Sequence, residues 1–129
     1  MISRDNLALY LNNFLNCAEY SNDYAPNGLQ VEGSDEISTI CTAVTASKEI
    51  AVQAAYLGAD ALLVHHGYFW RSESPLLTGM KSRRIAALIQ NKLNLFAYHL
   101  PLDCHLQIGN NACIANLLNV KNITRHTAM

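Results

Sequence analysis

The chain has 129 residues, half of them hydrophobic and 15% charged, and its net charge is −1. This length fits a single domain over residues 1–129 that buries roughly two-thirds of its unfolded surface. The balanced charge, without a run of lysine or arginine, gives no signal for nucleic acid or for an anionic membrane surface. No apolar run approaches the ~20 residues that span a bilayer. The first residues lack the basic and apolar regions of a signal peptide, so we expect a soluble, cytoplasmic protein.

The cysteines are scattered without a CxxC pair: Cys17, Cys41, Cys104 and Cys113. Their spacing predicts reduced, mostly buried thiols and neither a disulfide framework nor a zinc knuckle. Cys104 stands beside His105, which leaves a nucleophilic thiol as an alternative. Adjacency in sequence is not, however, the geometry that a Cys–His pair requires.

The first part of the chain predicts one helix and two strands. Ser3 can cap a helix whose apolar positions follow the helical period: Leu7, Leu11, Phe14 and Leu15. Pro26, Asn27 and Gly28 favour a loop with a tight turn over residues 22–28. A short strand is expected over residues 29–32, and the β-branched stretch 37–45 predicts a longer one.

Helices and strands alternate in the rest of the chain. Ser47 can cap a helix that Gly58 ends, with an expected inner face of Ile50, Ala51, Ala54, Ala55 and Leu57. A buried strand over residues 60–64 ends at two histidines. The remaining expected elements are a helix from about Met80 to Gln90, a strand over Asn94–Tyr98 and a last helix from Asn110 or Asn111 through Leu118.

This alternation predicts an α/β fold with a largely parallel sheet flanked by helices. Right-handed crossovers place the carboxyl ends of successive parallel strands at one edge of the sheet, where open α/β sheets bind ligands. His65 and His66 follow one strand, and the segment 99–103 follows the next. These two polar clusters are therefore expected to be neighbours.

The adjacent histidines predict a metal site. Neighbouring side chains in a regular strand point to opposite faces, so we expect Gly67 to let the backbone turn and both imidazoles to converge. His65, His66 and Asp103, with His99 as a further candidate, suit zinc, manganese, iron or nickel and do not suit calcium. A paired site would hold metals ~3.5–4 Å apart and supply a nucleophile at neutral pH, which indicates hydrolysis.

Each candidate ligand also has a structural interpretation. His65 and His66 can be one partly buried and one surface histidine, and Asp103 can be a turn or helix-capping carboxylate. His99 can be an additional ligand or a donor that orients one. Three aromatic residues after the histidines can wall the site or stack a flat ring, although we expect core or subunit packing for at least two: Tyr68, Phe69 and Trp70.

Four stretches carry a recognisable set of motifs: DYAPNGLQVEG at 23–33, GADALLVHHGYFW at 58–70, HLPLD at 99–103 and GNN at 109–111. Together they resemble the Nif-three-like family, whose bacterial members are named GTP cyclohydrolase I type 2 homologues. The resemblance implies an α/β protein with a dinuclear divalent-metal site, assembled as a toroidal homohexamer. It further implies that His65 and Asp103 bind one metal, that His66 binds the other, and that His99 lines the same site.

The chain departs from the family in one respect. Members typically continue into a second, similar half that supplies a further histidine and a glutamate that bridges the metals, and this sequence resembles the N-terminal half. After Glu73 its only carboxylate side chain is Asp103, and His126 does not match the later motif. We therefore expect either a fragment or truncated product, or a companion chain that completes the metal site.

Two functions follow as alternatives. The first is a metal-dependent hydrolase that attacks an imidazole-ring or amide-like carbon, which the motifs favour. The second is a non-enzymatic metal-binding or regulatory assembly protein, which the absent second-half ligands favour. In either case we expect self-association, and weak metal binding by this chain alone.

Overall fold

The elements follow the predicted alternation of helices and strands. The structure, a computed structural model, describes residues 1–124. In chain order it contains β1 (Ile2–Ser3), α1 (Arg4–Phe14), the 3-10 helix η1 (Cys17–Tyr20), β2 (Gly28–Val31), β3 (Glu36–Ile37), β4 (Ile40–Thr45), α2 (Lys48–Tyr56), β5 (Ala61–His66), α3 (Gly79–Gln90), β6 (Asn94–Ala97), α4 (Leu100–Asp103) and α5 (Asn110–Leu117). Within the described range, no helix has the length and apolar character needed to cross a bilayer.

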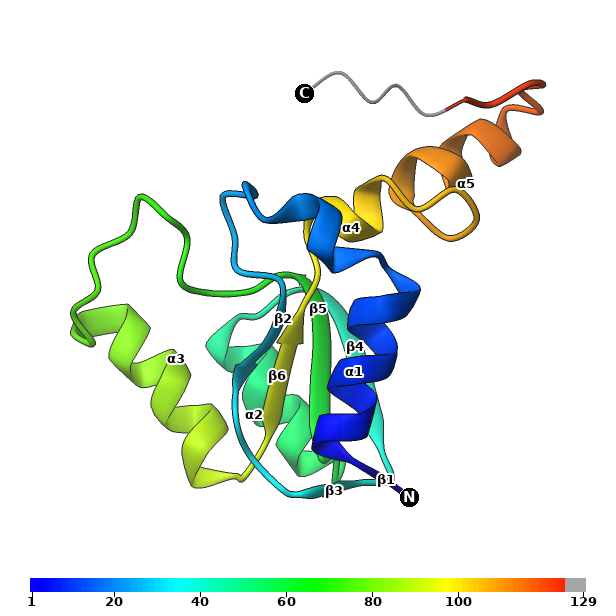
Figure 1. The fold of residues 1–129 in the computed structure, drawn as a ribbon. Helices are drawn as coiled ribbons and strands as arrows, with labels where there is room; N and C mark the ends of the chain where they lie inside the picture. The colour runs from blue at the N-terminus through cyan, green and yellow to red at the C-terminus, as the bar shows by residue number, and fades with distance from the viewer. Residues whose placement is uncertain (125–129) are drawn as a thin grey trace.

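The main sheet has four strands in the order β2-β6-β5-β4. β4, β5 and β6 pair in parallel, and β2 joins β6 antiparallel at one edge. The predicted α/β fold with a largely parallel sheet is confirmed. Figure 1 shows the consequence for the site: the carboxyl ends of β5 and β6 lie at the same edge, close to α4.

The two faces of the sheet have separate cores. Leu62 and Val64 of β5 point to the face covered by α2 and α3, where Leu88 is fully buried. Ala61 points to the other face and packs with Leu7 of α1 (Figure 1). This alternation along β5 is the period of two that a strand imposes.

The capping predictions for the first two helices are confirmed. The Ser3 side chain accepts a hydrogen bond from the backbone N–H of Asn6, and Ser47 does the same for Ile50. Gly58 follows α2 with φ +73°, in the left-handed region that a C-terminal stop requires. Each cap satisfies a backbone donor that the helix leaves unpaired.

The expected single strand over residues 37–45 is wrong. The chain forms β3, which pairs antiparallel with β1 outside the main sheet, and then β4, which pairs with β5. The break is at Ser38 and Thr39, whose backbone N–H groups donate to the Asp60 carboxylate at 2.9 and 3.0 Å. A side-chain acceptor thus replaces the strand ladder at this point.

Two burial predictions also need correction. Leu57 was expected on the inner face of its helix, yet it follows the last residue of α2, where the chain turns, and is 61% exposed. The thiols are also less buried than expected. Three are partly buried, and the fourth, Cys113, is exposed on α5.

Candidate metal centre

Three histidines converge at the carboxyl ends of β5 and β6. His65 and His66 are the last residues of β5, and His99 follows β6 by two positions. One ligand nitrogen from each ring lies within 4.8 Å of the other two. The convergence arises because adjacent parallel strands end at the same edge.

A backbone acceptor sets the orientation of His65. Its Nδ1 lies 3.0 Å from the carbonyl oxygen of Tyr98, so Nδ1 carries the proton and donates it. Nε2 is then an unprotonated nitrogen with a lone pair. It lies 3.6 Å from Oδ1 of Asp103. Ligand atoms that each lie ~2.0–2.2 Å from one tetrahedral ion are about 3.3–3.6 Å apart, which matches this separation.

Asp103 is held in place by a second side chain. It ends α4, and its Oδ1 accepts a 2.7 Å hydrogen bond from Nδ2 of Asn110 at the start of α5. Carboxylates that bind metals are usually fixed by such a hydrogen bond. The structure therefore places the Asp103 carboxylate beside His65, as the strand argument predicts.

His99 is held by Asp23, a residue that the sequence analysis did not assign to the site. Nδ1 of His99 donates to Oδ1 of Asp23 at 2.8 Å, so in the neutral ring Nε2 is the nitrogen that has the lone pair. The Asp23 side chain is 1% exposed. Burial raises the pKa of this carboxyl, but hydrogen bonds from Asn27, His99 and two backbone amides bring it below its ordinary value. Asp23 is thus a buried, charged acceptor for His99.

The loop over residues 22–28 contributes a second contact to the same segment. The backbone N–H of His99 donates to Oδ1 of Asn27 at 2.7 Å, and that of Leu100 donates to Oδ2 of Asp23 at 3.0 Å. The sequence analysis interpreted this loop through its turn residues only. Its place in the first family-like motif was the available signal that it has a role at the site.

His66 lies beside a hydroxyl of the neighbouring strand. Its Nδ1 lies 3.2 Å from the Thr45 hydroxyl, on the neighbouring strand β4. Burial, followed by the nearby His65 and His99, lowers the pKa of His66 below the ordinary histidine value, while Asp103 raises it. A lowered pKa keeps the imidazole neutral, which is the form that binds metal.

Gly67 does not provide the turn that the sequence analysis expected. It is absent from the positive-φ residues, and β5 runs through His66. A Cβ at Gly67 would instead collide with the side chains of Gln30 and Ala97. The glycine is required for close packing beside the site, and the histidine rings converge with centroids 4.4 Å apart at the end of a regular strand.

The aromatic residues after the histidines divide between core and site. Tyr68 is buried in the core at 4% exposure, and Phe69 is 36% exposed. The Trp70 ring lies 5.0 Å from that of His99 and 6.0 Å from that of His66, so it forms a wall of the cluster.

The other two histidines have different positions. His105 packs on Phe14 with ring centroids 4.8 Å apart, and its Nδ1 accepts backbone N–H groups of the following turn. His126 lies outside the described residues.

A family model supports the resemblance seen in the sequence. The model of Duf34/NIF3 (NGG1p interacting factor 3) matches residues 2–129. The chain belongs to the Duf34/NIF3 family.

Named relatives of this NIF3-family chain agree with that assignment. A GTP cyclohydrolase 1 type 2 homolog of Haemophilus influenzae is 59% identical over 102 residues, covering 79% of this chain and 41% of the relative. The homolog of Escherichia coli K12 is 54% identical over 110 residues, covering 85% and 44%. The chain thus spans less than half the length of these curated relatives.

Solved structures of NIF3-family proteins have the same fold. The protein ybgI, described as of unknown function, has a TM-score of 0.87 and 51% identity, covering 91% of this chain and 47% of its own. TTHA1606 from Thermus thermophilus has a TM-score of 0.91 and 38% identity, covering 98% and 52%.

The donor set in this NIF3-family chain fits a transition-metal ion. His65 and His99 each hold Nδ1 against an oxygen acceptor and leave Nε2 without a donor or acceptor hydrogen bond to residues 1–124, and the lowered pKa of His66 favours its neutral form. The Asp103 carboxylate lies 3.6 Å from His65 but outside the group of ligand atoms that all lie within 4.8 Å of one another, in which His99 stands instead. Imidazole nitrogen with a single carboxylate suits zinc, manganese, iron or nickel, whereas calcium prefers oxygen ligands.

Proposed function

We propose that this chain binds one divalent transition-metal ion through His65, His66, His99 and Asp103, and that the bound ion serves a hydrolytic reaction. The observation that supports the proposal is the orientation of His65 and His99. Each ring donates Nδ1–H to an oxygen acceptor, so each leaves a lone pair on Nε2. Such pre-orientation by a carbonyl or carboxylate is typical of metal-binding histidines.

The same donor set argues for one ion per chain. Two adjacent cations repel each other and need bridging anionic ligands to offset the repulsion. Asp103 is the carboxylate that faces His65, and the Asp23 carboxylate is engaged by His99, Asn27 and backbone amides. A dinuclear site, as the resemblance implies, would need a further anionic ligand from a companion chain.

Within this proposal, the residues of the chain position the reactants. Tyr98 and Asp23 hold two imidazoles through their oxygen atoms, Asn110 holds Asp103, and the Trp70 ring packs edge-on against His99. A divalent cation bound there supplies Lewis acidity, which makes water a nucleophile near neutral pH. The relatives named GTP cyclohydrolase 1 type 2 homolog suggest a nucleotide as the first substrate to test.

Calorimetric titration with zinc or manganese chloride tests the metal site. We expect one ion per wild-type chain and a loss of affinity of at least about tenfold in His65→Ala and in His99→Ala. His105→Ala is the matched control, because this histidine packs on Phe14 away from the cluster, and its affinity should equal that of wild type. Binding should weaken as pH falls through ~6.5, where protons compete for imidazole. Equal affinity in His99→Ala and His105→Ala would contradict the proposal, as would two tight ions on the isolated wild-type chain.

The alternative function is metal binding without turnover, in a regulatory or assembly protein. The presence of one carboxylate in the donor set favours it, because a single held ion can be structural. Chromatography of GTP after incubation with the metal-loaded chain separates the two functions. Metal-dependent loss of GTP that His99→Ala abolishes supports the hydrolase, and an unchanged GTP peak with a bound ion supports the alternative.

A further inference from the structure

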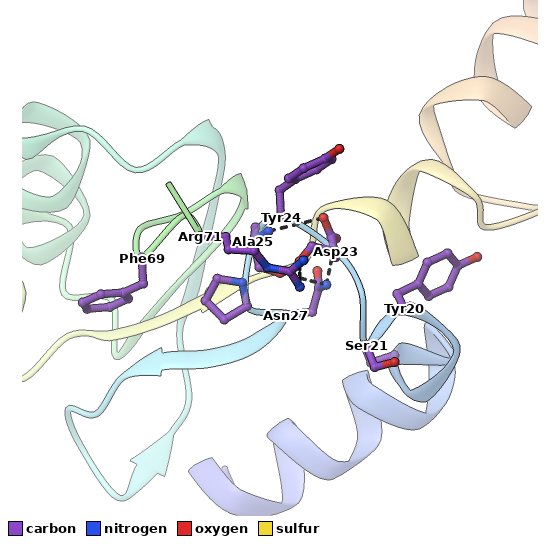
Figure 2. A pocket seen from close by; sticks show the side chains of 10 residues that line it. Tyr20, Ser21, Asp23, Tyr24, Ala25, Asn27, Phe69 and Arg71 are labelled. Atoms are coloured by element: carbon purple, nitrogen blue, oxygen red, sulfur yellow. Dashed lines mark hydrogen bonds between the residues drawn. The ribbon is translucent and has the colours of Figure 1, made fainter. Parts of the chain in front are cut away.

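A pocket of about 390 Å³ lies beside the candidate metal centre. The loop before β2 forms one wall, with Ser21, Tyr24 and Asn27, and the segment after β5 forms the other, with Phe69 and Arg71. Figure 2 shows the Arg71 side chain reaching between these walls toward Asp23 and Asn27. The volume is within the range of pockets that bind small molecules, roughly 300–1,000 Å³.

Two segments of the chain contribute both to the pocket and to the histidine cluster. Asp23 lines the pocket, and its carboxylate accepts the hydrogen bond from His99. Trp70 stands between Phe69 and Arg71 in the chain, and its ring faces His66 and His99. Three consecutive residues thus serve both sites: Phe69 and Arg71 line the pocket, and Trp70 walls the cluster.

The segment that carries Arg71 is held in an unusual conformation. Phe69 has φ +64°, which is a strained value for a bulky residue. On one side of it, Tyr68 N–H donates to Gln30 Oε1 at 2.7 Å, and on the other side Arg71 N–H donates to the Tyr24 carbonyl at 2.8 Å. The first bond ties the segment to β2 and the second ties it to the opposite wall, and together they fix the position of the Arg71 backbone.

The charge of Arg71 is not matched by a carboxylate. Its guanidinium donates to the backbone carbonyl oxygen of Asp23 at 3.1 Å, and no carboxylate among residues 1–124 forms an ion pair with it within 4.0 Å. The nearby Asp23 carboxylate is buried and accepts hydrogen bonds from four other groups. A second cation, Lys81, lies 5.1 Å from the centre of the Phe69 ring and pairs with Glu73. The guanidinium therefore retains donors for a ligand.

We infer that this pocket binds the oxyanion, phosphate or carboxylate, of a small molecule whose other end reaches the histidine cluster. Arg71 is the anion ligand, because its planar fork matches both kinds of oxyanion. Tyr24 and Phe69 supply exposed aromatic surface for the organic part of the molecule. The inference rests on the proposed function for the reacting end of the molecule, and it names an anionic substrate class for that site.

The fluorescence of Trp70, the single tryptophan of the sequence, reports on ligand binding in the pocket indirectly, because this residue lies in the chain between the lining residues Phe69 and Arg71. The probes are phenyl phosphate, benzoate and the uncharged benzyl alcohol, each added in the presence of EDTA so that no anion binds through a metal. We expect saturable fluorescence changes with one or both anions and at least about tenfold weaker binding of benzyl alcohol. Whichever anion binds more tightly shows whether the pocket prefers a phosphate or a carboxylate. Equal binding of all three probes would overturn the inference without any variant.

Variants assign the binding to the guanidinium. Arg71→Gln should weaken the preferred anion by about 10–100-fold, and Arg71→Lys should fall between it and wild type. Arg83→Gln, on the exposed surface of α3, is the charge-matched control and should bind as wild type does. Wild-type affinity in a folded Arg71→Gln chain would overturn the assignment.

A zinc titration of the same variants separates this inference from the proposed function. Arg71→Gln should bind zinc as wild type does, because Arg71 is outside the donor set. Anion binding without zinc binding would overturn the metal proposal and leave the pocket. Zinc binding without anion binding would overturn the pocket and leave the metal proposal.

Discussion

Asp23 and His99 are 76 residues apart in the sequence and 2.8 Å apart in the fold. The carboxylate is enclosed by donors, two from side chains and two from the backbone. A buried charge is stable only with such compensation, so the loop over residues 22–28 and the segment after β6 must fold together. At the scale of single residues, this contact connects the turn of the first motif to the candidate ligand His99.

Replacing Asp23 with asparagine tests whether it acts through His99. The amide keeps the shape but turns a donor toward Asn27 and the Leu100 N–H, so we expect a loss of stability of about 1–3 kcal/mol. Zinc affinity should fall by ~10–100-fold, because the uncharged amide oxygen that then faces His99 is a weaker acceptor than the carboxylate and holds the ring less firmly. Calorimetry on the folded variant measures the affinity, with Asp5→Asn, on the exposed side of α1, as the control.

A double mutant distinguishes positioning from a general effect on the fold. In the His99→Ala background, Asp23→Asn should cause little further loss of zinc affinity, because its effect passes through the missing ring. Independent, additive losses in the two variants would show that Asp23 does not act through His99.

At the scale of elements, Asp60 separates β3 from β4. One carboxylate oxygen, Oδ2, accepts from Ser38 N–H, the Ser38 hydroxyl and Thr39 N–H, and these bonds end the extended stretch. The same hydrogen bonds from Ser38 and Thr39 lower the pKa of the Asp60 carboxyl. The pairing of β4 with β5 begins directly after this point, and its register places His66 opposite Thr45.

We predict that Asp60→Ala destabilises the fold by about 1–2 kcal/mol at pH 7 and that Asp60→Asn, which keeps an acceptor, costs less. A lowered folded-state pKa means that the charge stabilises the fold above the unfolded value of ~3.9 and ceases to do so as pH falls through the folded value. The difference in free energy of unfolding between wild type and Asp60→Asn should therefore be smaller at pH 3 than at pH 7. Urea unfolding at the two pH values measures it, with the 90% exposed Asp35 changed to alanine as the control. A gap that widens in acid would contradict the prediction.

At the scale of the whole molecule, one side of the sheet is incompletely covered. β4 is an edge strand, and its Val44 is 68% exposed. Beside it an apolar pocket of about 290 Å³ opens between α1 and the sheet, with Leu11, Phe14 and Leu63 in its lining. An open edge next to apolar surface is a common site of association between copies of a chain.

We therefore predict self-association of this chain at micromolar concentration, with a closed symmetric oligomer as the expected form. Val44→Lys should shift the equilibrium toward monomer, because an edge lysine opposes strand pairing. Val52→Lys, on the exposed face of α2, is the matched control. Sedimentation velocity measures both variants, and a wild-type monomer across the micromolar range would contradict the prediction. The family resemblance implies a hexamer, and the same measurement tests that number.

Much of the fold could be predicted from local pattern. Ser3 and Ser47 begin helices as their capping chemistry predicts, Gly58 ends one, and the alternation of elements predicts the parallel strands. The approach of Asp103 to His65 also follows from sequence, because the handedness of the crossover leaves one edge for both strand ends. These features depend on backbone geometry and period, which the residues of one segment carry by themselves.

Contacts between distant segments depended on the tertiary structure. Residues 37–45 have the composition of one strand, and the carboxylate of Asp60, the residue directly before β5, divides them. The sequence predicted a turn at Gly67, whereas the structure requires a glycine there because a Cβ would collide with the side chain of Gln30 on β2. The contacts that connect Asp23 and Arg71 to the site could not be read from local pattern, since His99 lies 76 residues from Asp23 and Asp23 lies 48 residues from Arg71 along the chain. Local sequence determined which elements form and where their ends meet, whereas the choice of hydrogen-bond partners at those ends required the packed fold, because a side chain's partners depend on distance in space.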